Sequence, residues 1–97
     1  MYNIVMIKNY FHLERHIKGV ANHYRIQILD IIATSEGISL EDIAKELDCS
    51  LKTAGEHTRR LFIAGLIYKK YRGRVVEHSL SPYGKTFHRF IKTFQHS

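Results

Sequence analysis

The sequence predicts a mainly α fold with one small β-hairpin, and three observations support this prediction. Apolar residues recur at helical spacing in several segments. Capping residues stand where those segments begin. One segment rich in β-branched and aromatic residues has Arg72-Gly73-Arg74 at its centre, as a short hairpin should. Because 97 residues suffice for one modest core, we expect a single domain over residues 1–97, with about five helices and a two-stranded hairpin in the order of a winged helix-turn-helix.

The first two helices are expected near residues 3–18 and after Asn22, which is placed to cap the second one. The first has an apolar stripe wide enough to face two neighbours, and this stripe includes Ile4, Ile7 and Phe11. The second lies in VANHYRIQILDII and is apolar on several sides, so we expect it to be the central core helix. Its inward candidates are Ile26, Leu29 and Ile32.

A helix-turn-helix is predicted between Ser39 and Gly65. The segment LEDIAKEL follows the capping residue Ser39 and repeats apolar residues at i, i+3, i+4 and i+7, so one of its faces is buried. Residues 48–50 are too few for anything but a sharp turn, and Ser50 is placed to cap the helix that follows. This second helix is expected over residues 51–64, with Gly65 as the left-handed residue that ends it.

The outer face of the predicted helix over residues 51–64 is polar and cationic. Long cationic side chains reach DNA phosphates, and side chains near a helix N-terminus can bond base edges in a major groove. The candidates are Ser50, Lys52, Thr53, Glu56, His57, Arg59 and Arg60. A solvated surface helix has the same pattern, so this helix alone does not decide between the two interpretations.

The predicted hairpin over residues 67–80 favours nucleic acid. Its candidates are Lys69, Lys70, Tyr71, Arg72 and Arg74. We expect its tip to lie along a phosphate backbone or in the neighbouring minor groove. Residues 59–74 hold six cations and the next acid is Glu77, whereas residues 30–48 hold six acids against Lys45 alone. Such a charge asymmetry within a small domain is typical of polyanion binding.

The last helix is expected over residues 81–96, with Ser81 as N-cap and Pro82 at its first helical position. Its apolar ridge is too large for a terminal helix to leave in water, and consists of Tyr83, Phe87, Phe90, Ile91 and Phe94. We therefore expect a dimer formed by helices in segments 1–18 and 81–96, on either side of a core at 20–80. The predicted interface consists of Ile4, Ile7, Phe11, Phe87, Phe90, Ile91 and Phe94. The alternative is a monomer in which the two terminal helices pack only on each other.

The formal charge of +6 and the pI near 9.6 suit a partner with phosphates and an anionic membrane surface alike. The cations gather on the predicted hairpin and the helix before it rather than beside an apolar helix face, so we expect no membrane partner. No apolar run is long enough to span a bilayer, and the first residues lack the pattern of a signal peptide. Together with the single cysteine, Cys49, this predicts a cytoplasmic location.

Metal and catalytic sites find little support. His12 and His16 are spaced to chelate an ion from one helix face, but no third ligand follows at a characteristic spacing. The sequence shows no nucleophile–base pairing, no Gly-rich phosphate loop and no paired-carboxylate signature. We therefore expect no metal, no cofactor and no enzymatic activity.

Three segments resemble the ArsR-type winged-helix transcriptional regulators and, more loosely, their MarR-like relatives: VANHYRIQILDII, LEDIAKELDCSLKTAGEHTRRLFIAGLI and YKKYRGRVVEHSLSPYGK. The resemblance spans residues 20–85. It is most specific at Asn22, Arg25, Ser50, Thr53, Ala54, His57, Arg60, Leu61 and residues 64–67. It implies a homodimer that binds operator DNA. Metal-sensing members place paired cysteines where this chain has Ser39 and Glu41, so that sensor site is absent.

Four residues depart from the family pattern, namely Gly55, Thr58, Phe62 and Ile63. Glycine in a helix interior costs about 0.5–1 kcal/mol relative to alanine. A close approach of DNA or of another helix explains Gly55, and so does a tolerated weakness. Phe62 suits the core, whereas Ile63 falls on the polar side and suits contact with a protein partner.

We therefore predict a dimeric, sequence-specific DNA-binding regulator of transcription that acts on a palindromic operator. In this interpretation the base edges are approached by Lys52, Thr53, Glu56 and His57. The phosphates are held by Arg59, Arg60, Lys69, Lys70, Arg72 and Arg74. The alternative is a winged-helix protein-interaction module that uses Phe62, Ile63 and the last helix to dock on a larger assembly.

Overall fold

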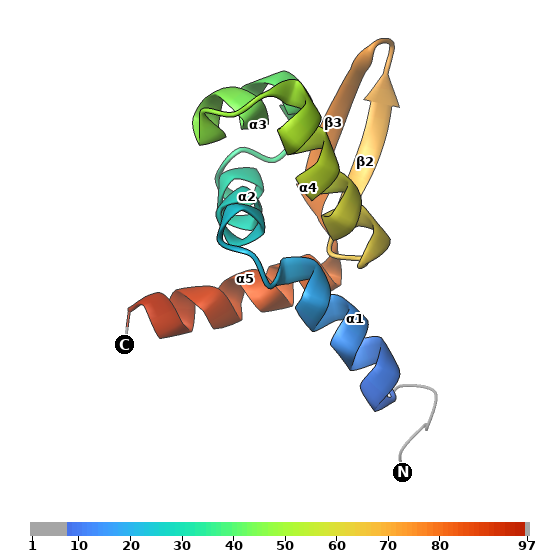
Figure 1. Cartoon of the computed structure of the whole chain (residues 1–97), viewed down its shortest axis with the longest axis vertical. Coiled ribbons are helices and arrows are strands. Elements are labelled where there is room, and N and C mark those ends of the chain that lie inside the picture. Colours follow the sequence, from blue (N-terminus) through green and yellow to red (C-terminus); the bar gives the residue numbers. More distant parts are fainter. Residues whose placement is uncertain (1–7, 97) are drawn as a thin grey trace.

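The computed structural model describes residues 8–96, and this part of the chain forms five helices and a three-stranded sheet (Figure 1). The elements follow in the order α1 (Tyr10–Val20), α2 (His23–Thr34), β1 (Ile38–Ser39), α3 (Leu40–Leu47), α4 (Leu51–Ile63), β2 (Ile67–Arg72), β3 (Val75–Leu80) and α5 (Pro82–Gln95). The predicted fold, mainly α with a hairpin in the order of a winged helix-turn-helix, is therefore confirmed.

The helix-turn-helix consists of α3 and α4, and each helix begins at its predicted cap. The hydroxyl of Ser39 accepts a hydrogen bond from the backbone N–H of Asp42 at 3.1 Å, and the hydroxyl of Ser50 accepts one from Thr53, also at 3.1 Å. These bonds satisfy N–H groups that have no partner inside the helix. Between the helices Asp48 takes the left-handed conformation, with φ of 54°, which turns the chain sharply.

The sheet has three strands in the order β1-β3-β2, whereas the sequence predicts only the two strands of the hairpin. β3 pairs with β2 as expected and also with β1, where Ile38 lies opposite His78. Nδ1 of the buried His78 side chain donates a hydrogen bond to the carbonyl oxygen of Ile38 at 2.9 Å. The prediction missed β1 because a strand of two residues is too short to show the alternation that marks strands in a sequence.

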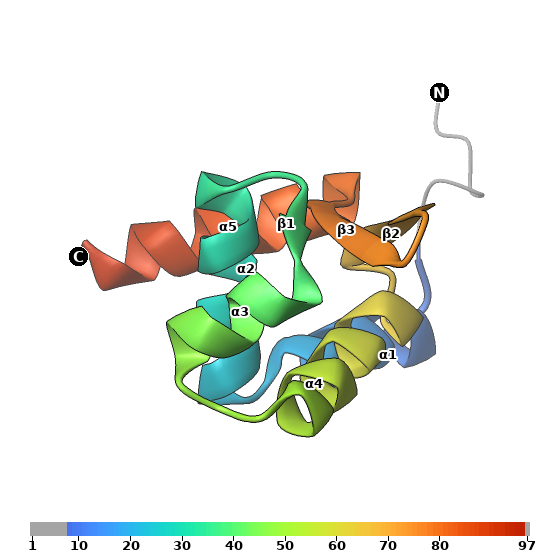
Figure 2. The same ribbon diagram turned by 90° about the horizontal axis from the view of Figure 1, so that it is seen from above.

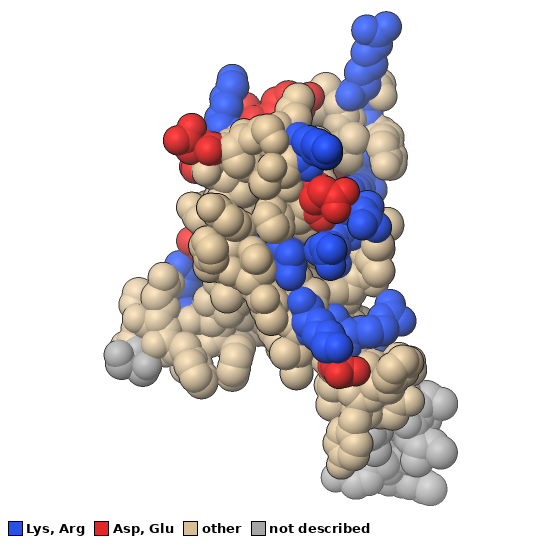
Figure 3. All heavy atoms as spheres, in the orientation of Figure 1, with Lys and Arg blue, Asp and Glu red and all other residues tan. Residues whose placement is uncertain are grey.

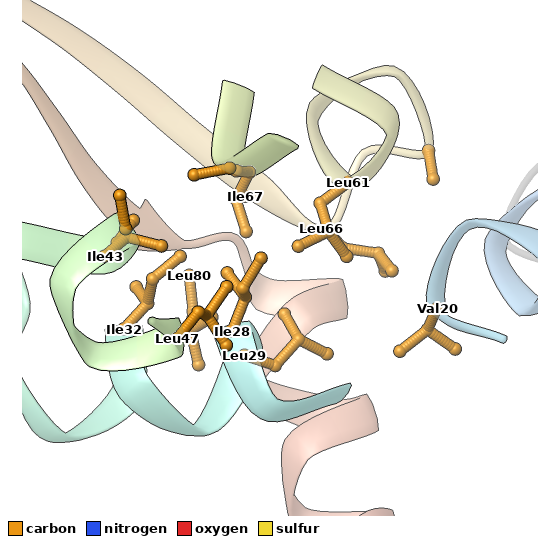
Figure 4. Close-up of a cluster of buried hydrophobic side chains, with 13 residues drawn as sticks. Val20, Ile28, Leu29, Ile32, Ile43, Leu47, Leu61, Leu66, Ile67 and Leu80 are labelled. Carbon is orange, nitrogen blue, oxygen red and sulfur yellow. The ribbon is translucent and has the colours of Figure 1, made fainter. Parts of the chain in front are cut away.

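The core lies where α2, α3 and α4 meet the inner end of the hairpin (Figure 4). Its buried apolar residues are Val20, Ile28, Leu29, Ile32, Ile43, Ala44, Leu47, Ala54, Leu61, Ala64, Leu66, Ile67 and Leu80. The inward positions predicted for Leu29 and Ile32 are confirmed. Ile26 is 37% exposed instead, and Ile28 is fully buried. The prediction for Ile26 is wrong because a helix with apolar residues on several sides does not reveal which side is covered.

α1 begins later than the sequence predicts. It starts after Asn9, whose side chain accepts a hydrogen bond from the backbone N–H of His12 at 2.9 Å. The helix predicted near residues 3–18 therefore starts too early, because an apolar stripe indicates a buried face but does not mark where a helix begins. The predicted interface residues Ile4 and Ile7 lie outside the described part of the chain.

α1 and α5 leave the core in different directions (Figures 1 and 2). α1 contacts α2 and α4, and it approaches α4 closely at Gly19, where a Cβ would lie 2.2 Å from the Cβ of Ala64. α5 contacts α2 and β3. The carboxylate of Asp30 on α2 accepts hydrogen bonds from Nε2 of His88 and Nζ of Lys92 on α5, both at 2.9 Å. These hydrogen bonds lower the pKa of Asp30, and the bond from His88 has the largest effect.

Candidate nucleic-acid interface

The inner face of α4 packs on the core, where Ala54, Thr58 and Leu61 are buried. The opposite, outer face is exposed. The exposed residues of the predicted site are Ser50, Lys52, Thr53, Glu56, Arg59 and Arg60. Ser50 and Thr53 are bonded to each other, since the Ser50 hydroxyl also donates to Oγ1 of Thr53 at 3.0 Å. The structure thus places these side chains on one surface, and Ser50 in addition shapes the start of the helix.

The hairpin of β2 and β3 forms a wing that projects beyond α4 (Figure 1). Arg72 pairs with Val75, so Gly73 and Arg74 form a two-residue turn. Gly73 has a φ of 64°, whereas the φ of Arg74 is not positive. A glycine at the first central position suits the tight turns that match the twist of hairpin strands. This turn exposes Arg74 at the tip, near Arg72 and Tyr71, which are also exposed.

Basic side chains gather on the face of the molecule that carries α4 and the wing (Figure 3). Two arginines, one on α4 and one on the wing, have acidic partners. Nη2 of Arg59 lies 3.6 Å from Oε2 of Glu56, and Nε of Arg72 lies 3.2 Å from Oε2 of Glu77. A linear count of charges misses the second pair, because antiparallel pairing brings Glu77 back beside the arginine. Both arginines are exposed, and exposed ion pairs contribute only about 0–1 kcal/mol, so phosphates can compete for them.

Lys69 and Lys70 lie on opposite faces of β2. Lys70 is exposed and lies opposite Glu77, whereas Lys69 is half-buried and lies opposite the buried His78. The Lys69 ammonium is 5.5 Å from the ring centroid of Phe62 on α4, and burial lowers its pKa. The sequence treats the two lysines alike, but in the structure Lys69 joins the wing to α4 and Lys70 faces solvent.

His57 lies at the edge of the α4 surface and contacts α2. Nη1 of Arg25 donates to its Nδ1 at 3.3 Å, and its ring centroid lies 5.5 Å from that of Tyr24. Arg25 is itself held by a hydrogen bond from its Nε to the carbonyl oxygen of Gly19 at 2.7 Å. Burial, followed by the positive charges of Arg25 and Arg60, lowers the pKa of His57. The imidazole is therefore neutral at neutral pH, with Nδ1 accepting and the proton on Nε2.

Residues 22–72, just over half of the chain, match the model of the MarR family. The chain belongs to the MarR family. The matched segment runs from the N-cap of α2 to the end of β2, so it contains the helix-turn-helix and the first strand of the wing. The resemblance to ArsR-type regulators and their MarR-like relatives is confirmed by this match and by the solved structures below. No curated protein sequence matches the chain.

Several solved structures share the fold. HlyU from Vibrio cholerae N16961 is 23% identical, with a TM-score of 0.82 over 93% of this chain and 98% of its own. The homodimeric winged helix-turn-helix DNA-binding domain of Mb0332 from Mycobacterium bovis, a possible ArsR-family transcriptional regulator, is 28% identical, with a TM-score of 0.73 over 87% of this chain and 75% of its own. FabT from Streptococcus pneumoniae, solved in complex with DNA, is 21% identical, with a TM-score of 0.71 over 95% of this chain and 71% of its own. The family and the fold are those of transcriptional regulators rather than enzymes.

An apolar groove of about 550 Å³ lies between α1, α2 and α5 of this MarR-family chain. Its lining includes Leu13, Ile17, Ile26, Phe87, Phe90 and Ile91. Phe87 and Ile91 are half-buried at the groove, whereas Phe90 is 54% exposed. Phe11 and Phe94, the other predicted interface residues in the described part, are exposed. The groove therefore joins much of the apolar surface that the sequence predicts to be covered in a dimer.

Within the described part of the chain, the two terminal helices approach each other at the start of α5. The rings of His16 on α1 and Tyr83 on α5 have centroids 5.0 Å apart, and beyond this contact the helices diverge (Figures 1 and 2). Each helix packs instead on the winged-helix core. The alternative monomer, in which these helices pack only on each other, is therefore not the arrangement found.

Phe62 and Ile63 end α4 with exposed side chains, 48% and 54% respectively. The ammonium of Lys69 lies over the Phe62 ring, and the carbonyl oxygen of Ile63 accepts a hydrogen bond from Nη2 of Arg15 at 3.1 Å. Phe62 thus does not complete the core. None of the compared proteins supports a protein partner at these two residues.

Sequence reasoning did not place Arg15 and Lys18 of α1 beside Arg59 and Arg60, with which they line one pocket. It also gave Arg25 no role in the site, although this residue holds His57. Neither arrangement follows from local spacing. His16, considered with His12 as a metal pair, contacts α4 instead, because its Nδ1 lies 2.6 Å from the carbonyl oxygen of Ala64.

Within residues 8–96 no group of three or more His, Cys, Asp and Glu side chains is placed to hold a metal ion. Nor is any helix in that range long and apolar enough to cross a membrane.

Proposed function

We propose that this chain binds double-stranded DNA sequence-specifically and regulates transcription. The observation that carries the proposal is that the outer face of α4 and the arginine-tipped wing lie on the same face of the molecule (Figure 3). A helix fits the major groove, about 12 Å wide, and a hairpin beside it reaches the flanking backbone or minor groove. The complex of the structurally similar FabT with DNA supports this proposal.

The proposal divides the site residues into two roles. Near the start of α4 the exposed side chains of Lys52, Thr53 and Glu56 approach base edges, with Ser50 beside them. His57 offers Nε2–H from a fixed ring and so suits an acceptor on the DNA. The phosphates are held by Arg59, Arg60, Lys70, Arg72 and Arg74, with Tyr71 alongside and Lys69 bridging wing and helix.

We further propose that a second copy of the chain covers the apolar groove, with α1 and α5 as dimerisation helices on either side of a core over residues 20–80. The apolar lining of the groove and the exposed Phe90 beside it favour a partner of the same character. The homodimeric state of the Mb0332 domain supports this assembly. Two-fold symmetry then presents two copies of α4 to half-sites about 34–36 Å apart on a palindromic operator. Because the family is one of transcriptional regulators and the proposed partner is DNA, we further propose a cytoplasmic location.

Selection of duplexes from a random pool tests the function directly. We expect the full chain to enrich an inverted repeat, and its affinity for duplex DNA to fall with salt at a log–log slope of about −0.9 per phosphate contacted. If the chain does not retard duplex DNA even at low salt, the proposed function is wrong.

Substitutions separate the two roles within the site. Arg72→Ala and Arg74→Ala should each weaken binding to all duplexes alike and lower the salt slope by about one, whereas Lys52→Ala should change the selected sequence. Lys45→Ala is the matched control, since it removes a cation from α3 among Asp42 and Glu46. Unchanged affinity in both wing variants would show that the wing does not contact DNA.

A further inference from the structure

We infer that the DNA-binding surface continues from α4 onto α1, where Arg15 and Lys18 bind backbone phosphates beside Arg59 and Arg60. This inference rests on the proposed function and extends its contact surface to a helix otherwise assigned to dimerisation. Figure 3 shows basic side chains reaching from the wing over α4 to α1 on a single face.

The site is a concave pocket of about 270 Å³ between α1 and α4. Four cations line it, Arg15 and Lys18 from α1 and Arg59 and Arg60 from α4. Arginine in particular offers a planar fork of N–H donors that matches the oxygens of a phosphate. Two helices thus direct positive charge into one hollow, and that hollow is large enough to receive a phosphate group.

A close helix–helix contact creates this pocket. Gly19 lies against Ala64, and a Cβ at Gly19 would be 2.2 Å from the Cβ of Ala64, so a residue with a side chain would push α1 away. Two hydrogen bonds secure the contact, one from Nη2 of Arg15 to the Ile63 carbonyl oxygen and one from Nδ1 of His16 to that of Ala64. They satisfy carbonyl groups that the end of α4 leaves without helical partners.

Arg15 is held ready for a further ligand. Its bond to Ile63 uses one of the five N–H donors of the guanidinium. The group is therefore positioned by α4 while most of its donors remain for a phosphate, and binding orders less of the side chain than it would on a free surface.

The acidic groups nearby do not cancel this charge. Glu14 lies 3.3 Å from Nζ of Lys18, and Glu56 lies 3.6 Å from Nη2 of Arg59. Each is an exposed pair within one helix, and such pairs contribute about 0.3–0.5 kcal/mol. Four cations against two carboxylates leave the pocket positive.

The test is the salt dependence of duplex binding by the full chain carrying Arg15→Gln, Lys18→Gln or both. Each substitution should weaken binding to every duplex by roughly threefold to tenfold. Each should also reduce the log–log salt slope by about 0.9 for every phosphate that the variant no longer binds. The selected DNA sequence should not change, because phosphate contacts carry no base information.

Two further variants make the result decisive. Lys45→Gln removes the same charge outside the pocket and should leave the salt slope unchanged, and Arg15→Lys keeps the cation and should keep the slope. If Arg15→Gln weakens binding without lowering the salt slope, the residue acts through Ile63 and the phosphate contact is wrong. If the double variant binds like the unsubstituted chain while the wing variants bind weakly, the inference fails and the proposed function stands. If the unsubstituted chain binds no duplex, both fail.

Discussion

At the scale of single residues, His78 and His57 make the stability of the fold depend on pH. His78 is 1% exposed, and burial lowers its pKa despite the hydrogen bond to Ile38. Burial, with the neighbouring cations, also lowers the pKa of His57. In the unfolded chain both side chains return to an ordinary pKa of 6.5. As the pH falls through 6.5, the unfolded chain therefore takes up these protons before the folded one does.

The two neutral histidines should therefore not reduce the free energy of unfolding above pH 6.5. As the pH falls below 6.5, the free energy of unfolding should decrease. Denaturant midpoints measured between pH 5 and 8 check this prediction. Asp30 does not disturb the range, because its pKa lies below the ordinary 3.8 and its stabilising bonds are lost only in more acidic solution. A midpoint that rises on acidification from pH 8 to pH 5.5 would contradict it.

His78→Asn isolates the contribution of the buried ring. The asparagine amide keeps a donor near the position of Nδ1 for the Ile38 carbonyl but does not titrate. We expect the variant to be less stable than the natural chain at pH 8, because it leaves a cavity, and to lose less stability than the natural chain between pH 8 and pH 5.5. An unaltered pH dependence would assign the effect to other groups.

At the scale of elements, two helical glycines differ in the space that a Cβ would have, so their alanine variants can be compared directly. Gly19 in α1 has Ala64 in the space that its Cβ would occupy, whereas a Cβ at Gly55 in α4 would meet only the Leu40 Cδ2, at 3.9 Å. No protein neighbour within the described structure thus requires glycine at position 55. Of the three explanations that the sequence leaves open, a close approach of another helix is therefore excluded for this chain on its own.

Alanine at these positions should shift stability in opposite directions. Gly55→Ala should stabilise the protein by about 0.5–1 kcal/mol through helix propensity. Gly19→Ala should destabilise it by about 1–3 kcal/mol, because overpacking forces α1 away from α4. Urea denaturation measures both. A Gly19→Ala variant as stable as the natural chain would show that α1 and α4 are not in close contact.

Gly55→Ala also reports on the DNA interface. If the variant is more stable and binds duplex DNA as before, Gly55 is a tolerated weakness. A more stable variant with weaker binding would indicate that the DNA backbone approaches α4 at this residue.

At the scale of the whole molecule, the proposed dimer places a second copy of the chain on the apolar groove between α1, α2 and α5. Phe90 stands at its edge with its ring centroid 4.7 Å from that of Phe94, so a charge there would oppose a second copy without entering the winged-helix core. We expect a dimer at micromolar concentration in sedimentation equilibrium, and a shift toward monomer in Phe90→Glu.

Tyr71→Ser is the control for this experiment, because it removes an exposed aromatic ring from the wing, away from the groove. It should leave the dimer intact. If the natural chain is entirely monomeric at the same concentration, the proposed assembly is wrong. DNA binding by a single copy can still be tested in that case.

Much of the fold was predictable because its signals are local. The caps Asn22, Ser39, Ser50 and Ser81 are all confirmed, since capping depends on residues within one helical turn. The turn at Gly73 likewise depends on one residue that adopts positive φ without strain. The start of α1 was missed although its cap, Asn9, is also a local signal, because the apolar stripe was followed past it. The strand β1 and the exposure of Ile26 were not predictable, because they depend on neighbours that apolar periodicity does not report.

By itself, the sequence determined the helix-turn-helix, the hairpin and the stretch of chain in which cations gather, because each follows from short-range spacing and capping. Only the tertiary structure decided how those cations are arranged. It turned Lys69 toward α4, returned Glu77 to Arg72, and brought Arg15 to Ile63, which is 48 residues further along the chain. Contacts between distant segments depend on how closely helices and strands can approach, as at Gly19, and no local pattern of residues encodes that distance.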